Sequence, residues 1–479
     1  MKKKSWLPIL CLCLSLLWSL PAWAANQVAP GVRQWSFQKT NWEGKPYLGH
    51  VLEVDPKQRF TEIRPIMGND LVGSKEVLSS MAERTGAVAA INGGFFDTGS
   101  GIPVGNVIID GKAEYISDIL RTSFGLTNDG SMVVGYLSPQ VKLAINGSEL
   151  KLNGINMDPL SNGLVLYSPA WNKDIPASMK LMLYPAEEGS FRMEPSYSGI
   201  PAPAGGYILA GYGQSASQLV SIQAGTRARV SLDMPENWQN IRHGLSGGPL
   251  LVEGGLPVEQ AINEGLWGSV LQAAPRTAIG ITANQKILLV VVDGRIDSSA
   301  GLTLEELAYL MIELGSVQAV ALDGGGSSEM WVKGQIVNTP SDKRERALGN
   351  GLVIIQQMPV YIDQQRAYFD VPPQVENGRT LVPMRKIFEQ LGAEIAWDAE
   401  AKKVTATRGE QIIELTVGSS AAVVNGNKVT LDVPAKVLDS RTLVPLRFVG
   451  EALGADVNYV TSGGPTIYID SRGGTGDVK

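Results

Sequence analysis

Two uninterrupted apolar runs, with an amphipathic segment between them, form the clearest pattern in the chain. Residues 287–292 and 319–322 contain no polar position. Continuous runs of this length are typical of parallel strands that are covered on both faces. Between the two runs, Thr303 and Glu306 are spaced as a capping box, and Gly315 follows the last position with helical spacing. We therefore predict a β-α-β unit.

A second helix with an apolar face is predicted from Ser74 to Arg84, followed by a third buried strand over 87–91. The rest of the segment is rich in glycine and in short apolar runs separated by turn pairs such as Asn146-Gly147. We predict that residues 25–357 form one large domain of α+β or mixed α/β class with parallel β-α-β units.

An internal repeat marks the last part of the chain. The segment 377–385 recurs as 439–447, and each copy continues into a helical pattern that ends at a glycine, Gly392 or Gly454. We predict a small α+β domain of two repeats over residues 360–472.

The N-terminus has the order of a signal peptide: lysines at 2–4, an apolar stretch over 6–20, and Ala22-Trp23-Ala24 before a cleavage point. We therefore predict that residues 1–24 are removed and that the protein is secreted, extracellular or associated with the cell envelope. Both cysteines, Cys11 and Cys13, lie in this segment. The mature chain should thus contain no disulfide, thiolate metal ligand or cysteine nucleophile.

Charge and composition exclude several other functions. The formal net charge is −6 and there is no Lys/Arg-rich run, which argues against nucleic-acid binding. No stretch of the mature chain is apolar for the roughly 20 residues that a transmembrane helix needs. With His50 and His243 as the two histidines, we expect no metal site or cofactor, although carboxylates leave structural calcium open.

The predicted strands end in polar, glycine-rich turns that can bind an anion. These turns are 92–97, 293–295 and 323–329. Ligands bind at the carboxyl ends of parallel strands, where loops diverge. Glycines let backbone N–H groups approach a phosphate, and the hydroxyls of Ser327 and Ser328 add donors. The alternative is that these glycines only form tight turns.

Four segments in this order, 90–97, 276–280, 292–295 and 322–328, resemble the motifs of the phosphodiester glycosidase family. The resemblance implies a hydrolase that releases a sugar from a phosphodiester through an oxocarbenium-like transition state. The C-terminal repeats resemble the copper amine oxidase N-terminal-like, or stalk, repeats. Neither copy contains histidine or cysteine, so we expect a structural or wall-attaching role and not a copper site.

The resemblance also implies a set of site residues. Asp97 and Asp323 are the candidate catalytic carboxylates, with their two roles unassigned, and Arg276 is the candidate for binding the phosphate. The candidate substrate-binding residues are Asn92, Gly93, Gly94, Asp293, Gly324, Gly325, Gly326, Ser327, Ser328 and His243. Glu329 and Arg346 are reserves.

Each of these residues also has a structural interpretation. Arg276 can anchor a strand through an ion pair, Asp323 can accept hydrogen bonds from its own glycine turn, and Asp293 can pair with Arg295. Of the adjacent aromatics Phe95 and Phe96, one can form a wall for a sugar ring while the other lies in the core.

We therefore expect a secreted hydrolase that cleaves a glycosyl-1-phosphodiester of the N-acetylglucosamine type to a free sugar and a phosphate monoester. Its partner would be a phosphorylated glycan of the envelope or the extracellular space, and the repeats would attach it to the cell wall. The alternative is a non-enzymatic, phosphoglycan-binding envelope protein. The presence of Asp97, Arg276 and Asp323 together favours the enzyme.

Overall fold

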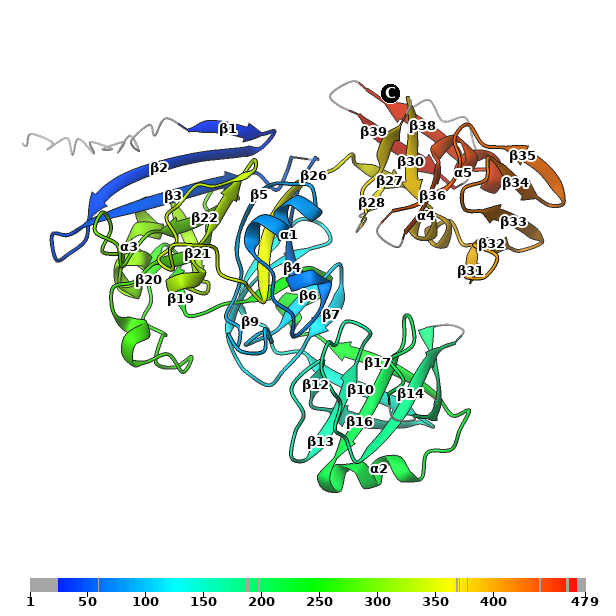
Figure 1. Cartoon of the computed structure of the whole chain (residues 1–479), viewed down its shortest axis with the longest axis horizontal. Helices are drawn as coiled ribbons and strands as arrows, with labels where there is room; N and C mark the ends of the chain where they lie inside the picture. Colours follow the sequence, from blue (N-terminus) through cyan, green and yellow to red (C-terminus); the bar gives the residue numbers. More distant parts are fainter. Residues whose placement is uncertain are drawn as a thin grey trace, which may run out of the picture.

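The computed structural model describes residues 25–471, except 59, 187–188, 197–198, 368, 370, 377, 439–440 and 462–464. The predicted signal peptide, residues 1–24, lies outside the described residues, as do Asn377, Asp439 and Ser440 of the repeat. The chain is 48% strand and 12% helix. The described strands form seven sheets, arranged as shown in Figure 1.

The first sheet contains both long apolar runs. Its strands, in spatial order, are β1 (Asn26–Ala29), β2 (Val32–Thr40), β3 (Pro46–Val54), β22 (Ile287–Val292), β21 (Arg276–Thr282), β23 (Ser316–Ala321), β19 (Leu250–Glu253) and β20 (Leu256–Pro257). The helix α3 (Leu304–Glu313) packs on one face, against Val290 and Ala319 among others.

The predicted fold class, α+β or mixed α/β with parallel β-α-β units, is wrong. The strands β22 and β23 are not neighbours, because β21 lies between them and pairs antiparallel with both. The continuous apolar pattern correctly indicated burial on both faces, but an antiparallel sheet covered by α3 on one side and by other strands on the other produces the same pattern. The protein is mostly β and largely antiparallel.

The predicted start of α3 is confirmed. The hydroxyl of Thr303 accepts from the N–H of Glu306 at 3.2 Å, and the Glu306 carboxylate accepts from the N–H of Thr303 at 2.8 Å. This capping box satisfies two N–H groups that would otherwise lack partners at the helix end. The helix ends before Gly315, whose φ of +97° suits glycine.

Two five-stranded sheets pack beside the first. One consists of β25 (Gln335–Ile336), β24 (Met330–Val332), β5 (Ala87–Asn92), β26 (Asn350–Gln356) and β4 (Thr61–Met67). The other consists of β7 (Lys112–Tyr115), β6 (Val107–Ile109), β18 (Ile241–Ser246), β8 (Thr122–Thr127) and β9 (Met132–Tyr136). The helix α1 (Leu78–Arg84) starts four residues later than predicted, because Glu76 forms a β-bridge with Leu348.

An eight-stranded sheet forms the lower lobe in Figure 1. Its strands are β11 (Ser148–Leu152), β10 (Gln140–Ile145), β17 (Arg227–Asp233), β15 (Phe191–Pro195), β14 (Met179–Pro185), β16 (Tyr207–Tyr212), β13 (Gly163–Tyr167) and β12 (Gly154–Ile155), with the short helix α2 (Ser217–Val220) beside it. A separate apolar cluster that includes Leu143, Leu166 and Leu183 forms the core of this lobe.

The repeats fold as two equivalent strand–helix units. The strands β30 (Arg379–Pro383) and β37 (Arg441–Pro445) pair antiparallel through Val382 and Val444 and are followed by the helices α4 (Met384–Gln390) and α5 (Leu446–Leu453). The other strands are β27 (Val360–Ile362), β28 (Gln365–Ala367), β29 (Gln374–Glu376), β31 (Glu394–Asp398), β32 (Lys403–Arg408), β33 (Gln411–Thr416), β34 (Ala421–Val424), β35 (Asn427–Thr430), β36 (Lys436–Leu438), β38 (Asp456–Val460) and β39 (Thr466–Asp470). Their buried residues form a core of their own. The predicted domain boundaries stay predictions.

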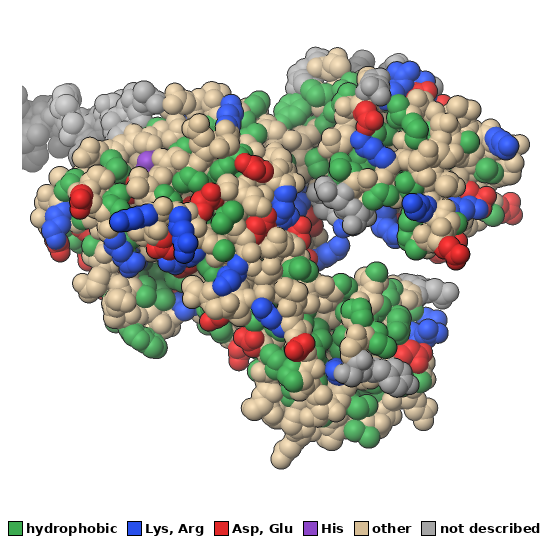
Figure 2. All heavy atoms as spheres, viewed as in Figure 1, with side chains coloured by type: hydrophobic (Ala, Val, Ile, Leu, Met, Phe, Trp, Pro, Cys, Tyr) green, Lys and Arg blue, Asp and Glu red, His purple; other side chains and the backbone are tan. Residues whose placement is uncertain are grey.

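The surface carries both signs of charge. On the face shown in Figure 2, Lys and Arg side chains are interspersed with Asp and Glu, and a hollow separates the C-terminal strands from the lower lobe. None of the helices in the described part of the chain has the length and apolarity needed to cross a bilayer.

Candidate functional site

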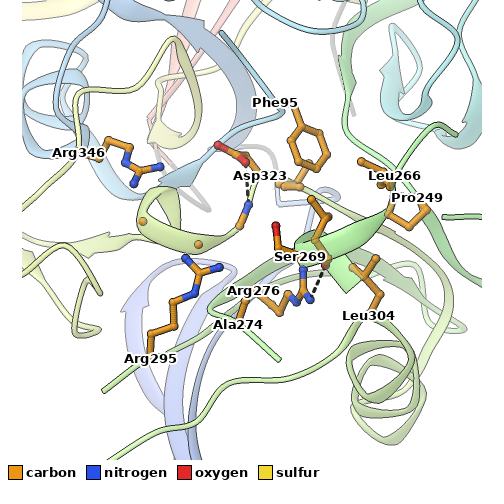
Figure 3. Close-up of a pocket in the computed structure, with 15 residues that line it drawn as sticks. Phe95, Pro249, Leu266, Ser269, Ala274, Arg276, Arg295, Leu304, Asp323 and Arg346 are labelled. Atoms are coloured by element: carbon orange, nitrogen blue, oxygen red, sulfur yellow. Dashed lines mark hydrogen bonds between the residues drawn. The ribbon is translucent and has the colours of Figure 1, made fainter. Parts of the chain in front are cut away.

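A pocket of about 220 Å³ lies at the ends of β22 and β23, where the turn after β23 carries three consecutive glycines (Figure 3). Asp323 and Gly324–Gly326 line it on one side. The strand β21 begins at this edge with Arg276, because β21 runs antiparallel to both neighbours. The pocket therefore brings together two residues predicted from separate motifs.

Asn92 joins a second sheet to this edge. Its side-chain amide donates to the carbonyl of Asp323 at 2.7 Å, and its side-chain oxygen accepts from the hydroxyl of Thr277 at 2.8 Å and from the N–H of Glu329 at 3.2 Å. Asn92 is buried and its hydrogen-bonding capacity is used within the protein. It holds the strand ends together and does not itself line the pocket.

Three guanidinium groups surround the glycine turn. Arg276, Arg295 and Arg346 all line the pocket, and Figure 3 shows the side chains of Arg295 and Arg346 on either side of the turn. Arg346 pairs with Asp342 at 2.7 Å, whereas Arg276 and Arg295 form no ion pair with any described carboxylate. An uncompensated positive charge of this kind favours an anionic ligand.

Arg276 is anchored and still charged. It donates to the backbone carbonyls of Leu302, Val270 and Gln272 at 2.5–2.8 Å. Burial, together with the nearby charge of Arg295, lowers the pKa of Arg276 to about 10, so it is protonated at neutral pH. The ion-pair interpretation from the sequence does not hold for the described residues, because the anchors of Arg276 are carbonyl groups.

Asp323 is a half-buried carboxyl group in the pocket wall. One of its oxygens accepts from the N–H of Gly324 at 3.0 Å. Burial raises the pKa of Asp323 to about 6, although its hydrogen bonds with Ser327 and Gly324 and the charge of Arg346 act in the opposite direction. A carboxyl group with this pKa can exchange a proton near neutral pH.

The opposite wall of the pocket is apolar. Phe95, Pro249, Leu266, Val270 and Leu304 line it. Phe96, the neighbour of Phe95, is buried in the core, which is the division that alternating strand faces favour. Such a wall can pack against the less polar face of a sugar ring.

Asp97 lies outside the pocket. Its exposed side chain accepts from the N–H of Ser100 at 2.6 Å and closes a turn, and hydrogen bonds from Ser100 lower its pKa. The structure therefore does not bring Asp97 and Asp323 together in this pocket.

Asp293 and His243 are also buried elsewhere. Asp293 accepts from the amide of Asn338 and the N–H of Thr339, both at 3.0 Å, and lies 3.5 Å from His50. It does not pair with Arg295. These contacts hold residues 338–339 in place. Because Asp293 does not pair with Arg295, the Arg295 side chain can face the pocket.

His243 belongs to a buried charged cluster with Glu62, Asp110, Arg242 and Arg64. Within the described residues, only Glu62, Asp110 and His243 offer three grouped metal-binding side chains. Because Arg242 binds both carboxylates and Arg64 lies 3.9 Å from Asp110, two positive charges balance the two negative ones, which argues against a divalent cation there. The expectation of no cofactor stays a prediction.

The glycines next to the site allow close packing. A Cβ on Gly94 would overlap the carbonyl oxygen of Ser246, and one on Gly93 would overlap the side chain of Asn350. A Cβ on Gly326 would overlap the guanidinium of Arg346. Gly94 therefore requires glycine, because the backbone of Ser246 cannot move aside easily, whereas at Gly326 the flexible Arg346 side chain can shift.

Ser327, Ser328 and Glu329 lie beneath the glycine turn and are buried. Ser327 accepts from Arg346 at 3.4 Å, whereas the Ser328 hydroxyl and one Glu329 oxygen have no partner among the described residues. The other Glu329 oxygen accepts from the N–H of Arg346 at 2.7 Å. Burial raises the pKa of Glu329 to about 8, so its carboxyl group is mostly protonated and neutral at pH 7. In this form it can still accept the hydrogen bond from the N–H of Arg346.

The sequence reasoning did not select Arg295, Leu266, Val270 or Leu304 for the site. The sequence could have suggested Arg295 as a site residue, because it directly follows the Asp293-Gly294 turn. In the structure its φ is +58°. Leu266 and Val270 had no such signal, because the loop at 258–275 contains no recognisable motif, and Leu304 was predicted only as part of the helix that follows Thr303.

Two parts of the chain match known protein families. The phosphodiester glycosidase family model matches residues 186–355, and the copper amine oxidase N-terminal domain model matches residues 361–469. The N-acetylglucosamine-1-phosphodiester alpha-N-acetylglucosaminidase of Mus musculus is 23% identical over 328 residues, which are 67% of this chain and 47% of the mouse protein. The chain spans less than half the length of the curated relatives that it matches.

Two crystal structures share the fold. A hypothetical protein from Synechocystis has a TM-score of 0.62 and 23% identity over 71% of this chain and 64% of that chain. A protein of Burkholderia pseudomallei K96243 has a TM-score of 0.54 and 25% identity over 65% of this chain and 74% of that chain. Residues 186–355, which contain Arg276, Asp323 and Arg346, thus match the phosphodiester glycosidase family, with distant homology to the mouse enzyme, and residues 361–469 match the copper amine oxidase N-terminal domain.

Proposed function

We propose that the protein is a secreted hydrolase that cleaves a glycosyl-1-phosphodiester of the N-acetylglucosamine type and releases a free sugar and a phosphate monoester. The observation that carries the proposal is the grouping of Asp323 with three arginines around one glycine turn. A phosphate diester needs cationic donors, and the anomeric carbon needs a carboxylate close to its developing positive charge.

In the proposed reaction, Arg295 and Arg346 hold the phosphate, and Arg276 adds positive charge from its anchored position. The sugar ring packs against Phe95. Water adds to the anomeric carbon as the bond from that carbon to the phosphate oxygen breaks, and the electron pair leaves with the phosphate monoester.

Asp323 acts in its ionised form, either by activating the water or by stabilising the positive charge on the sugar. Because a phosphate departs readily, one carboxylate is enough, and Asp97 has no part in this mechanism.

The cellular setting is also proposed from the sequence. A signal peptide over residues 1–24 would export the protein, and the C-terminal repeats would attach it to the cell wall. The substrate would then be a phosphorylated glycan of the envelope or the extracellular medium.

The test is release of free N-acetylglucosamine from UDP-linked and mannose-linked α-N-acetylglucosamine-1-phosphodiesters, with teichoic and capsular phosphodiesters alongside. We expect Asp323→Asn to lower kcat about a hundredfold or more, and Arg295→Ala to lower kcat/KM about tenfold or more. Arg385→Ala, an exposed arginine on α4, is the matched control and should leave both constants unchanged. Binding of these substrates without any cleavage would instead support the phosphoglycan-binding alternative.

A further inference from the structure

A second pocket, of about 370 Å³, lies between the sheet that contains β9 and the sheet that contains β10. Its lining is mainly polar and includes Gln140, Lys151, Asn153 and the carboxylate of Asp118. Two aliphatic side chains, Ile119 and Leu120, also line it and are 41% and 50% exposed. Amide groups and one charge of each sign beside an aliphatic surface suit a sugar ring with polar hydroxyl groups.

Arg121 connects this pocket to the one at Asp323. It follows Leu120 directly in the chain, and its guanidinium lies 5.4 Å from the centre of the Phe95 ring, which forms a wall of the first pocket. Its side chain also passes beside Gly248, the neighbour of the wall residue Pro249. Residues 119–121 therefore lie beside both pockets, since Ile119 and Leu120 line the second and Arg121 contacts Phe95 of the first.

Arg121 forms no ion pair with any described carboxylate, and the one carboxylate that lines the second pocket is that of Asp118. Two guanidinium nitrogens of Arg121, Nε and Nη1, are buried without a hydrogen-bond partner among the described residues. The nearest charge that acts on Arg121 is that of Glu264, whose oxygens already accept from the N–H and hydroxyl of Thr122. No described carboxylate forms an ion pair with Lys151. A buried arginine without a partner carries an unfavourable desolvation that an anionic ligand would offset.

We propose that Arg121 and the second pocket form a binding subsite for the sugar and phosphate next to the cleaved linkage, so that the substrate is an oligomer or polymer of repeating sugar phosphodiesters. Arg121 binds the second phosphate at the edge of Phe95, and the adjoining sugar lies against Ile119 and Leu120 with Lys151 beyond it. This inference rests on the proposed function.

The test compares chain lengths. The substrates are a single α-N-acetylglucosamine-1-phosphodiester and synthetic oligomers of two to four such units, and kcat/KM is measured for each. We expect the tetramer to exceed the single unit by about tenfold or more, because each charge-assisted contact is worth at least 1.4 kcal/mol. The exposed Lys151→Ala should remove most of this advantage while the single-unit kcat/KM changes less than about twofold, and Arg121→Ala should lower kcat/KM more for the tetramer than for the single unit. Lys428→Ala, on β35, is the matched control.

Two kinds of kinetic result would contradict the proposed subsite. Equal kcat/KM for all lengths, or an equal loss for short and long substrates in both variants, would overturn the subsite. If no substrate is cleaved at any length, the proposed reaction fails, and binding of the same tetramer and single unit is measured by calorimetry instead. Affinity that rises with length and falls in both variants would support the subsite without the reaction, and affinity independent of length would overturn it.

Discussion

The ionised carboxylate of Asp323 lowers the free energy of unfolding, because the folded protein favours its protonated form. An aspartate in an unfolded chain has a pKa near 3.9, whereas burial raises the pKa of Asp323 to about 6 in the folded protein. Between these values the folded state binds more protons than the unfolded state. The free energy of unfolding therefore falls as pH rises through this window and is not recovered above pH 6.

We accordingly expect Asp323→Asn to raise the melting temperature at pH 7.5 while it removes turnover. The amide keeps an oxygen that accepts from Gly324 but never ionises. The gain should shrink toward zero at pH 4, where Asp323 is mostly protonated. Thermal unfolding at both pH values is the measurement. A variant less stable than the wild type at pH 7.5 would mean that the ionised carboxylate stabilises the fold.

The same pKa sets the expected pH profile of activity. Because the proposed mechanism uses the ionised carboxylate, kcat/KM should rise with pH, reach half its maximum near 6 and then level off. The profile is measured with a single-unit phosphodiester from pH 4.5 to 8. A rate that falls as pH rises through 6 would show that the protonated form is active, with Asp323 as the general acid.

At the scale of single residues, the sequence indicated part of the site. Asp323 could be found from its place between a buried apolar run and a glycine turn, whereas Arg276 was indicated by the resemblance to the phosphodiester glycosidase family. The sequence could not reveal that Asp97 is exposed. An aspartate in this position can accept a hydrogen bond within its own turn, as Asp97 does from Ser100, or it can face a ligand.

At the scale of elements, a buried ion pair joins three strand segments. Glu62 on β4 binds Arg242 on β18, and Asp110 follows β6. Burial alone would raise the pKa of Glu62, but the hydrogen bond with His243 and the charge of Arg242 prevail and lower it to about 2. Its ionised form is thus stabilised by the fold, and this contribution is lost only as pH falls from about 4.5 toward 2.

We expect Glu62→Gln to lower the free energy of unfolding by about 3–5 kcal/mol at pH 7, because Arg242 is left buried without its main partner. The control is Glu53→Gln on β3, whose partner Arg33 is half exposed and whose loss should cost at most about 1 kcal/mol. Urea unfolding measures both. Equal losses in the two variants would contradict the structural role given to the buried cluster.

The elements themselves were predicted better than their pairing. The capping box of Thr303 and Glu306 is a local signal and placed α3 correctly. The neighbours of β22 and β23 depend on β21, whose position between them is set by contacts distant in sequence. A buried apolar run does not encode strand direction, so the parallel unit was inferred where the sheet is antiparallel.

At the scale of the whole molecule, the C-terminal domain has a core separate from the one around the pocket. None of the residues that line the pocket at Asp323 lies beyond 357. We expect a chain ending at 357 to fold and to keep kcat/KM for a single-unit substrate within about twofold of the full chain, since separate cores unfold as separate units. Calorimetric unfolding and the same hydrolysis assay provide the test. Loss of folding on truncation would show that the two parts form one cooperative unit.

The most direct test of the central claim is hydrolysis of an α-N-acetylglucosamine-1-phosphodiester in water enriched in oxygen-18, with the products analysed by mass spectrometry. The proposed mechanism breaks the bond between the anomeric carbon and oxygen, so the heavy oxygen should appear in the free sugar and not in the phosphate monoester. Heavy oxygen in the phosphate, or release of sugar-1-phosphate, would show attack at phosphorus and contradict the assignment as a glycosidase.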